Sequence, residues 1–434
     1  MKGEVLFFDF GFEEYLPLIE GAASRGVRPI MNQAGMRSRL AASGVEARGF
    51  LEFATAADQA AARDQARDVI GRFSSTIKSL EAVQAFDAAP GNLLISGGAD
   101  LARSLLTIVE NQILVANIMS HVIDQTDLRA VVMRSCLSSG QRMIQQVADR
   151  AGIPVIEISH GNPPWDSDLV PPPIDWHFAA FGAREREVAR ERAGDPDHIH
   201  LTGAPHWDGL YSPINRPDRD AAKDALGLPR DIPFLLYAGS YSPGSTLFFA
   251  SEAQRVMRAN EMVASAVGKL IPQPLLGVRP HPGESRQKPG RRPTQDELTA
   301  YRDWFTAHGA NLIHVDYSET SIVREKAVLI RAADAVIIPE ASSTMITEVL
   351  LLGRPCVVIA DEESPFRSFY SPDDGVAYAS NAHELGTVLD RIITDPAYVT
   401  ELHDAAEAAL PELNHGHDGQ ATTRLVNLVI DLAA

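Results

Sequence analysis

Short apolar runs alternate with amphipathic stretches along almost the whole chain, and this alternation limits the possible folds more than any other feature of the sequence. Such runs, separated by helix-length segments, are typical of a parallel sheet covered by helices on both faces. The pattern therefore predicts an α/β protein. The runs expected to be strands are 4–10, 28–33, 130–135, 154–160 and 176–181 in the first half, and 233–240, 275–282, 311–316, 335–340 and 355–360 in the second.

The two series of strands predict two domains. A chain of 434 residues is longer than a single core usually supports. The segment 211–233 is rich in proline and charge and separates the two series. We expect a first domain over 1–212, a second over 213–415, and a C-terminal helix over 416–434 that crosses back to the first. The segment 53–125 has helical apolar spacing and is expected to be a long helical region.

Charge and composition narrow the class of partner. The formal charge of −18 argues against nucleic acid, because binding its phosphates requires a basic face. No apolar run approaches the ~20 residues of a membrane helix, and acidic residues interrupt the first strand, unlike a secretory signal. Cys136 and Cys356 are isolated, as expected of buried thiols in a reducing compartment. We expect a soluble cytoplasmic protein with no transmembrane segment, and peripheral membrane association stays open.

The segment LLGVRPHPGES carries the first candidate site residues. His281 follows a predicted strand at its carboxyl end, where ligands of open α/β sheets bind. Two prolines hold the backbone extended around the imidazole. His281, or the neighbouring Arg279, could bind a diphosphate or give a proton to a departing phosphate. The alternative is a solvent-exposed turn.

The segment AVIIPEASSTMITEVLLLG predicts an anion site at a strand-to-helix turn. Ser342, Ser343 and Thr344 would place hydroxyl groups beside the free N–H groups of the helix, and helix capping alone would explain one of them. Glu348, one turn into the helix, could accept hydrogen bonds from a ribose or be a solvated residue.

The segment PVIEISHGNPPW delivers His160 and Gly161 at the carboxyl end of a first-domain strand. His160 could be the general base that deprotonates an acceptor hydroxyl, and the alternative is a core histidine. No metal is predicted. Weaker candidates follow other strands: Asp9, Gly11 and Arg134 on the acceptor side, and Gly239 and Ser240 on the donor side. Asp373 and Asp374 are expected to be solvated loop residues.

Several segments in the right order resemble one superfamily. TGAPHWDGL at 202–210 resembles the strand-turn between the domains of GT-B transferases and UDP-N-acetylglucosamine 2-epimerases. RPHP at 279–282, the segment 341–359 and DGQATTRLVNLV at 418–429 resemble their second-domain blocks. ISHGNPPW at 158–165 resembles the HG block of CDP-glycerol glycerophosphotransferases and capsule polysaccharide transferases. The His-Pro and Ser-Ser pairing is similar to that of bacterial sialyl-, polysialyl- and Kdo-transferases, which use CMP-sugars.

The resemblance implies a GT-B fold, with two Rossmann-like domains facing a cleft. It implies that His281, Ser342 and Ser343 contact the donor phosphate and that His160 is the base on the acceptor side. We expect a metal-independent glycosyltransferase without a cofactor. It would move a sugar from a nucleotide-activated donor, a CMP-sugar in preference to a CDP- or UDP-linked one, onto a glycan or lipid-linked acceptor in surface polysaccharide or glycoconjugate synthesis.

Two alternatives stay open. One is a UDP-sugar 2-epimerase-like enzyme, although the Ser-Gly-Gly block of those epimerases is replaced here by Ser342-Ser343-Thr344. It would need acid/base carboxylates in the cleft and would convert the donor without a second substrate. The other is a non-catalytic GT-B module that binds a glycan or a partner.

Overall fold

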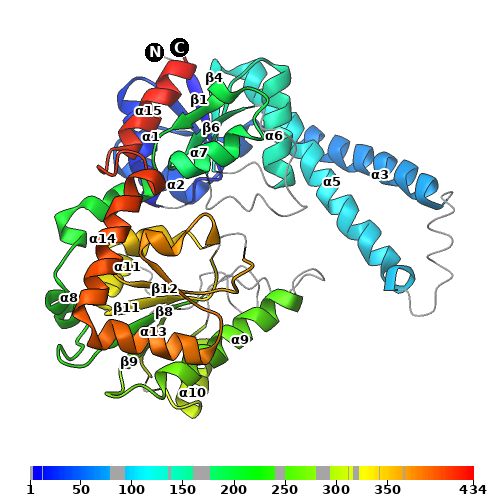
Figure 1. Ribbon diagram of the computed structural model, residues 1–434. Helices are drawn as coiled ribbons and strands as arrows, with labels where there is room; N and C mark the ends of the chain where they lie inside the picture. Colours follow the sequence, from blue (N-terminus) through cyan, green and yellow to red (C-terminus); the bar gives the residue numbers. More distant parts are fainter. Residues whose placement is uncertain are drawn as a thin grey trace.

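A computed structural model describes residues 3–11, 13–78, 93–134, 138–159, 176–239, 250–279, 294–310, 312–315, 322–341, 343–364 and 367–434. The described strands form two separate parallel sheets (Figure 1). The first has the order β3-β2-β1-β4-β5-β6-β7 and the second the order β10-β9-β8-β11-β12-β13. Parallel sheets with crossover helices confirm the predicted α/β class.

The strands of the first sheet are β1 (Glu4–Phe8), β2 (Arg28–Met31), β3 (Arg48–Gly49), β4 (Leu128–Met133), β5 (Val155–Ile158), β6 (His177–Ala180) and β7 (Ile199–Leu201). Those of the second are β8 (Phe234–Ala238), β9 (Leu275–Arg279), β10 (Leu312–Val315), β11 (Ala335–Ile338), β12 (Cys356–Ile359) and β13 (Val376–Ala379). Every apolar run that was predicted to be a strand overlaps one, and β4 begins two residues before its predicted run. The short edge strands β3, β7 and β13 were not predicted.

The helices of the first half are α1 (Leu16–Ser24), α2 (Ala34–Ala42), α3 (Ala56–Lys78), α5 (Leu93–Gln125), α6 (Ser139–Arg150) and α7 (Ala183–Arg190). Those of the second half are α8 (Arg219–Ala225), α9 (Ala250–Val267), α10 (Gln295–Ala307), α11 (Ile322–Ala332), α12 (Met345–Leu351) and α13 (Ala382–Thr394), followed by α14 (Pro396–Leu413) and α15 (Ala421–Leu432). Short 3₁₀ turns are η1 (Glu13–Tyr15), η2 (Phe50–Phe53), η3 (Pro196–His198), η4 (Pro205–Tyr211), η5 (Pro213–Asn215) and η7 (Pro372–Asp374).

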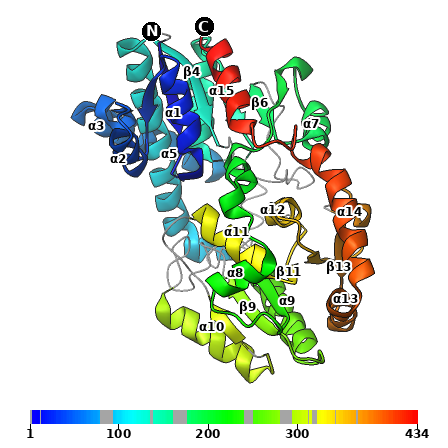
Figure 2. The same cartoon turned by 90° about the vertical axis from the view of Figure 1, so that its left-hand side faces the viewer.

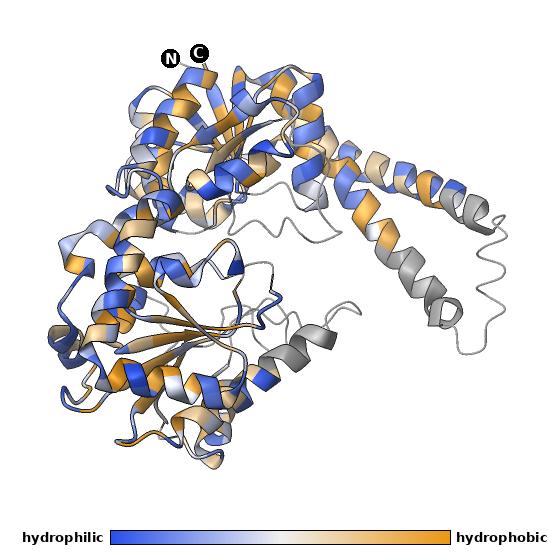
Figure 3. Cartoon of the chain, in the orientation of Figure 1, coloured by the Kyte–Doolittle hydropathy of each residue, from blue (hydrophilic) through white to orange (hydrophobic). Residues whose placement is uncertain are grey.

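Apolar strand residues build the core of both sheets. In the first sheet, Leu6 aligns with Ile30 on β2 and with Val131 on β4, and all three are fully buried in one cluster. The strands are accordingly the most hydrophobic parts of the molecule (Figure 3). A second cluster joins residues from both halves, among them Trp207 in η4 and Leu425 in α15. The two sheets therefore share a continuous apolar core instead of two isolated ones.

Helices α3 and α5 pack against each other and project from the first half as a long arm (Figure 1). The carboxyl-terminal part of α5 is anchored in the core by Ile118, Met119 and Val122. The stretch Leu105–Gln125 is long and apolar enough to cross a membrane by length and composition, with a mean hydropathy of 1.3. The sequence analysis expected no apolar run of this length, and Glu110 and Asp124 are the only charged residues within it. One helix of this kind is weak support for a membrane span.

The last two helices bridge the two sheets. Helix α14 packs against α12 and α13 of the second half and against α7 of the first, and α15 packs against α1 (Figures 1 and 2). Asp208 in η4 fixes the start of α15, because its carboxylate accepts hydrogen bonds from the backbone N–H groups of Ala421 at 3.0 Å and Thr422 at 2.7 Å. The aspartate of the TGAPHWDGL motif thus acts as an N-cap supplied from another segment.

An ion pair joins the two halves beside α14. The guanidinium of Arg184 in α7 donates to both carboxylate oxygens of Asp374 in η7, at 2.5 and 2.8 Å, and to the carbonyl of Phe369 at 2.8 Å. The side chain of Asp374 is only 6% exposed. The expectation that Asp374 is a solvated loop residue is wrong, since Arg184 of the other half covers its carboxylate. Asp373 is exposed, as expected.

Candidate functional site

The carboxyl ends of strands from both sheets carry the residues that the sequence analysis selected. Arg134 directly follows β4 in the first sheet, and Arg279 ends β9 in the second. Gly239 follows β8, and its N–H donates to the Arg279 carbonyl at 2.7 Å. These are the edges at which α/β sheets bind ligands. Residues from the two edges meet at one place, where the first half contributes η1 and the second contributes α11 and α12.

The meeting point is a buried ionic cluster of Glu14, Lys326 and Glu348. The Lys326 ammonium lies 2.8 Å from the Glu348 carboxylate and 3.9 Å from the Glu14 carboxylate. The Trp207 indole N–H donates to the same Glu348 oxygen at 3.3 Å. The three charged side chains are between 8% and 12% exposed. Glu348 is therefore not a solvated helix residue: it pairs with Lys326 of the same half and accepts from Trp207 of the other.

Burial and neighbouring charges set the proton affinity of this cluster. Burial raises the pKa of Glu14, the Lys326 ammonium opposes that rise, and the negative charge of Glu348 adds to it. Arg134 and Arg279 also lie close enough to lower it. Burial raises the pKa of Tyr15 to about 12, against the effect of Arg134, whose guanidinium carbon lies 5.2 Å from the Tyr15 ring centroid. Two carboxylates around one ammonium give acceptors for hydroxyl groups, and the two arginines give donors for an anion.

The other described candidates follow strands β1 and β11. The Ser343 hydroxyl accepts from the Met345 N–H at 3.3 Å, and Thr344 is the N-cap of α12 without a side-chain cap bond. Asp9 lies at the end of β1, where Gln141 donates to its carboxylate at 2.9 Å, and its backbone has a left-handed φ of 69°. Gly11 is exposed.

Five predicted site residues lie outside the described residues. They are His160, Gly161, Ser240, His281 and Ser342. Their assignments stay predictions from the sequence. Three of them adjoin described residues that follow strands: His160 comes after Ser159 and β5, Ser240 after Gly239 and β8, and Ser342 lies between Ala341 and Ser343 after β11. Within the described ranges, no group of three or more His, Cys, Asp or Glu side chains is placed to hold a metal ion.

Comparison with solved structures identifies the architecture. UDP-GlcNAc 2-epimerase from Neisseria meningitidis, bound to UDP-GlcNAc, matches with a TM-score of 0.56 at 12% identity, over 99% of both chains. Sucrose-phosphate synthase from Thermosynechococcus elongatus matches with the same TM-score, identity and coverage. HepE from Anabaena, in complex with UDP and glucose, matches with a TM-score of 0.53 at 13% identity over 98% of both chains. The fold is GT-B.

No protein-family model and no curated protein matches the sequence. At 11–13% identity the structural matches establish the fold alone. Two-sheet GT-B architecture over the whole chain agrees with the predicted fold class. The activity is argued below from the site itself, because one fold carries many activities.

Sequence reasoning missed several residues of this GT-B site, namely Glu14, Tyr15, Trp207 and Lys326. A signal for Lys326 was present. Leu329 and Ile330 lie one helical turn after it on the same face of α11, and both are buried. A lysine on the apolar face of a helix needs a buried partner. No local pattern marks Glu14, because its partners come from the other half of the chain.

A second buried carboxyl anchors the strand end that precedes His160. Glu185 in α7 is 2% exposed and accepts hydrogen bonds from the Ser159 hydroxyl and the Phe181 N–H, both at 2.5 Å. Burial raises the pKa of Glu185 to about 7, and these two hydrogen bonds only partly oppose the rise. In the folded protein the carboxyl therefore keeps its proton at pH values where an unfolded chain would have lost it.

This makes stability depend on pH. A raised folded pKa gives stability that is complete below the ordinary value of 4.5 and is lost as the pH rises through about 7. Between these pH values the native protein should lose on the order of 3 kcal/mol of its free energy of unfolding through this group. Glu185→Gln cannot ionise, so its stability relative to the native protein should rise with pH. Urea unfolding at pH 5 and pH 8 measures this. Glu187→Gln, an exposed residue of the same helix, is the control and should leave the pH dependence unchanged. If the free energy of unfolding changes equally between pH 5 and pH 8 in Glu185→Gln and in the native protein, the raised pKa of Glu185 is contradicted.

Proposed function

We propose that the protein is a nucleotide-sugar-dependent glycosyltransferase. The observation that carries this proposal is the buried cluster of Glu14, Lys326 and Glu348, which lies where the carboxyl edges of two Rossmann-like sheets meet. A transferase with two substrates needs such a meeting point, because one half can hold the donor and the other the acceptor. Proteins with the same fold have been solved with UDP, UDP-GlcNAc and glucose.

The donor is assigned to the second half. His281, Ser342 and Ser343 would bind its phosphate groups, with Arg279 beside them, and Glu348 would accept hydrogen bonds from sugar hydroxyls. The negative charge that develops on the leaving phosphate would be neutralised by these donors and the start of α12, so the proposal includes no metal. A CMP-sugar is the donor favoured by the His-Pro and Ser-Ser pairing.

The acceptor is assigned to the first half, as a hydroxyl group of a glycan. His160 would take the proton of that hydroxyl as it attacks the activated carbon, and the nucleotide would leave with the electron pair of the broken bond. Ser159 is held by Glu185, which fixes the chain immediately before this histidine. Arg134 and Asp9 would contact the acceptor.

A thermal-shift panel of CMP, CDP, UDP, GDP and dTDP tests the donor site. A ligand that binds only the folded protein raises its unfolding temperature, because a hundredfold excess over Kd adds about 2.7 kcal/mol to the free energy of unfolding. We expect one nucleotide to raise the midpoint of the native protein and not of His281→Ala. His383→Ala, an exposed histidine of α13, is the matched control and should respond like the native protein. No response to any nucleotide would favour a non-catalytic glycan- or partner-binding module.

An epimerase is the second candidate, and one observation favours it. Glu14 has a raised pKa and faces a second carboxylate across Lys326, as an acid/base pair would. The two activities differ in their need for an acceptor. Incubation with the nucleotide-sugar alone, followed by NMR of the donor, would show a changed sugar for an epimerase. A transferase would leave the sugar unchanged until a glycan acceptor is added.

A further inference from the structure

The second sheet has a cavity of about 580 Å³ at the edge opposite the candidate site. Its lining includes Pro233, Asp334 and Pro355, each immediately before the first residue of β8, β11 or β12. The candidate site lies instead beyond the last residues of these strands. The cavity is therefore separate from the proposed donor and acceptor positions, and nothing in the proposed transfer reaction uses it.

The cavity has a cationic wall and an apolar wall. The cationic side chains are Arg219 and Lys223 from α8, Arg230 from the loop before β8, and Arg354 from the turn after α12. The apolar wall belongs to α13 and α14 and includes Ile392, Ile393, Pro396, Val399 and Leu402. Such a combination suits a ligand with an anionic head and an apolar body.

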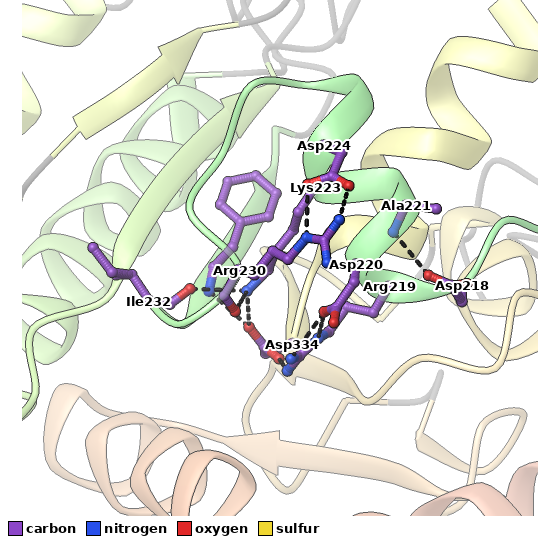
Figure 4. Close-up of polar contacts among 10 residues, drawn as sticks. Asp218, Arg219, Asp220, Ala221, Lys223, Asp224, Arg230, Ile232 and Asp334 are labelled. Atoms are coloured by element: carbon purple, nitrogen blue, oxygen red, sulfur yellow. Dashed lines mark hydrogen bonds and ion pairs between the residues drawn. The ribbon is translucent and has the colours of Figure 1, made fainter.

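Most of the charges around the cavity are already paired (Figure 4). Asp334 accepts from Arg219 at 2.7 Å, from the Lys223 ammonium at 3.1 Å and from the Phe234 N–H at 2.8 Å. The ammonium of Lys223, which is fully buried, also donates to the Ile232 carbonyl at 2.8 Å. Arg230 forms a bidentate ion pair with Asp224, in which its Nε lies 2.8 Å from Oδ1. Both carboxylate oxygens of Asp334 are therefore engaged by donors of the second half.

Arg354 is the exception. Its guanidinium has no hydrogen bond or ion pair with any described residue, and its Nε is buried. Burial and the nearby charge of Arg331 together lower the pKa of Arg354 to about 10. Asp231 lines the cavity but is exposed and lies beyond ion-pair distance of Arg354. The negative charges of Asp334 and Asp218 are felt at Arg354 but neither carboxylate pairs with its guanidinium. A partly buried cation without a bonded partner is costly, so its presence beside a cavity calls for an anion from outside the chain.

We propose that this cavity binds a phosphorylated small molecule, with the phosphate on Arg354 and the apolar part against α13 and α14. Guanidinium groups pair with phosphate through two parallel hydrogen bonds, and Arg354 has its donors free. Arg219 and Arg230 are 42% and 62% exposed, so their side chains can turn toward the same phosphate. A phosphate can accept hydrogen bonds from more than one arginine at once. A ligand with an apolar part should bind more tightly than inorganic phosphate, because that part is buried against the apolar wall.

The test is calorimetric titration of the full chain with phenyl phosphate, inorganic phosphate and phenol. We expect phenyl phosphate to bind most tightly, inorganic phosphate more weakly, and phenol without measurable heat. Arg354→Met keeps the length of the side chain and removes its donors, and we expect it to weaken phenyl phosphate binding at least about tenfold. Arg391→Met, which removes an exposed arginine of α13 outside the cavity lining, is the control and should bind like the native protein.

Thermal unfolding without ligand separates a binding role from a structural one. Arg354→Met should unfold at the same temperature as the native protein or higher, because it removes an unpaired buried charge. Asp231→Asn removes a negative charge from the lining and should tighten phenyl phosphate binding. The proposal is overturned if the native protein shows no saturable binding, if Arg354→Met binds as tightly as Arg391→Met, or if Arg354→Met unfolds several degrees lower.

Discussion

Replacing Lys326 by methionine is expected to lower the free energy of unfolding by about 3–5 kcal/mol, the usual loss when one partner of a buried ion pair is removed. Lys326 lies between Glu348 at 2.8 Å and Glu14 at 3.9 Å, so the variant leaves two carboxylates buried near each other without a cation. The pKa of Glu14, already raised by burial, should rise further. The destabilisation should therefore be larger at pH 8 than at pH 5, where protons can neutralise the carboxyls. Chemical denaturation at both pH values measures it.

A matched set of variants shows whether the lost stability comes from unpaired charge. Lys326→Met combined with Glu348→Gln removes one of the stranded carboxylates and should recover more than half of the loss. Lys326→Arg keeps the positive charge and should lower the free energy of unfolding less than Lys326→Met does. If the double variant is stable yet no longer responds to the nucleotide that stabilises the native protein, the cluster serves ligand binding as well as folding. If Lys326→Met unfolds at the same denaturant midpoint as the native protein, the stabilising role of the Lys326 ion pairs is refuted.

Gly182→Ala is expected to destabilise the protein by about 3 kcal/mol or more, because it overpacks a contact between two backbones. A Cβ at this position would lie 2.0 Å from the Glu412 carbonyl oxygen and 2.6 Å from the Leu413 carbonyl carbon. Neither atom can turn aside as a side chain could, so the end of α14 must move away from α7. That movement would also disturb Arg184, which donates to Glu412 at 3.1 Å and pairs with Asp374. Thermal and denaturant unfolding measure the effect.

Gly386→Ala in α13 and Gly140→Ala in α6 are the controls for this substitution. A Cβ at either position meets nothing within 4 Å. Alanine lowers the chain entropy of the unfolded state, so these variants should be neutral or more stable by about 0.4–1 kcal/mol. Similar midpoints for Gly182→Ala and the two controls would show that α14 can shift at little cost and that its contact with α7 is not tight.

The strands and the fold could be predicted from the sequence because a buried parallel strand is a continuous apolar run, and that signal is local. The edge strands β3 and β7 were missed because two and three residues are too few to form an apolar run, and β13 because it follows the charged turn at Pro372–Asp374. The candidate residues at strand ends could be selected because parallel strands finish at one edge. Asp374 and Glu348 could not be interpreted correctly, since their partners Arg184 and Lys326 are brought to them by tertiary packing.

Helix α15 has a consequence for how the chain acquires its structure during synthesis. It packs against α1, where a Cβ on Gly21 would lie 3.0 Å from a methyl of Val426, and its residue Leu425 is fully buried. A ribosome delivers the amino end first, at about 5–20 residues per second. The face of α1 that packs against α15 therefore stays exposed to solvent until the whole second sheet has left the ribosome. Nascent chains that stop before residue 413 should be sensitive to protease in their first half and should recruit chaperones that bind apolar surface.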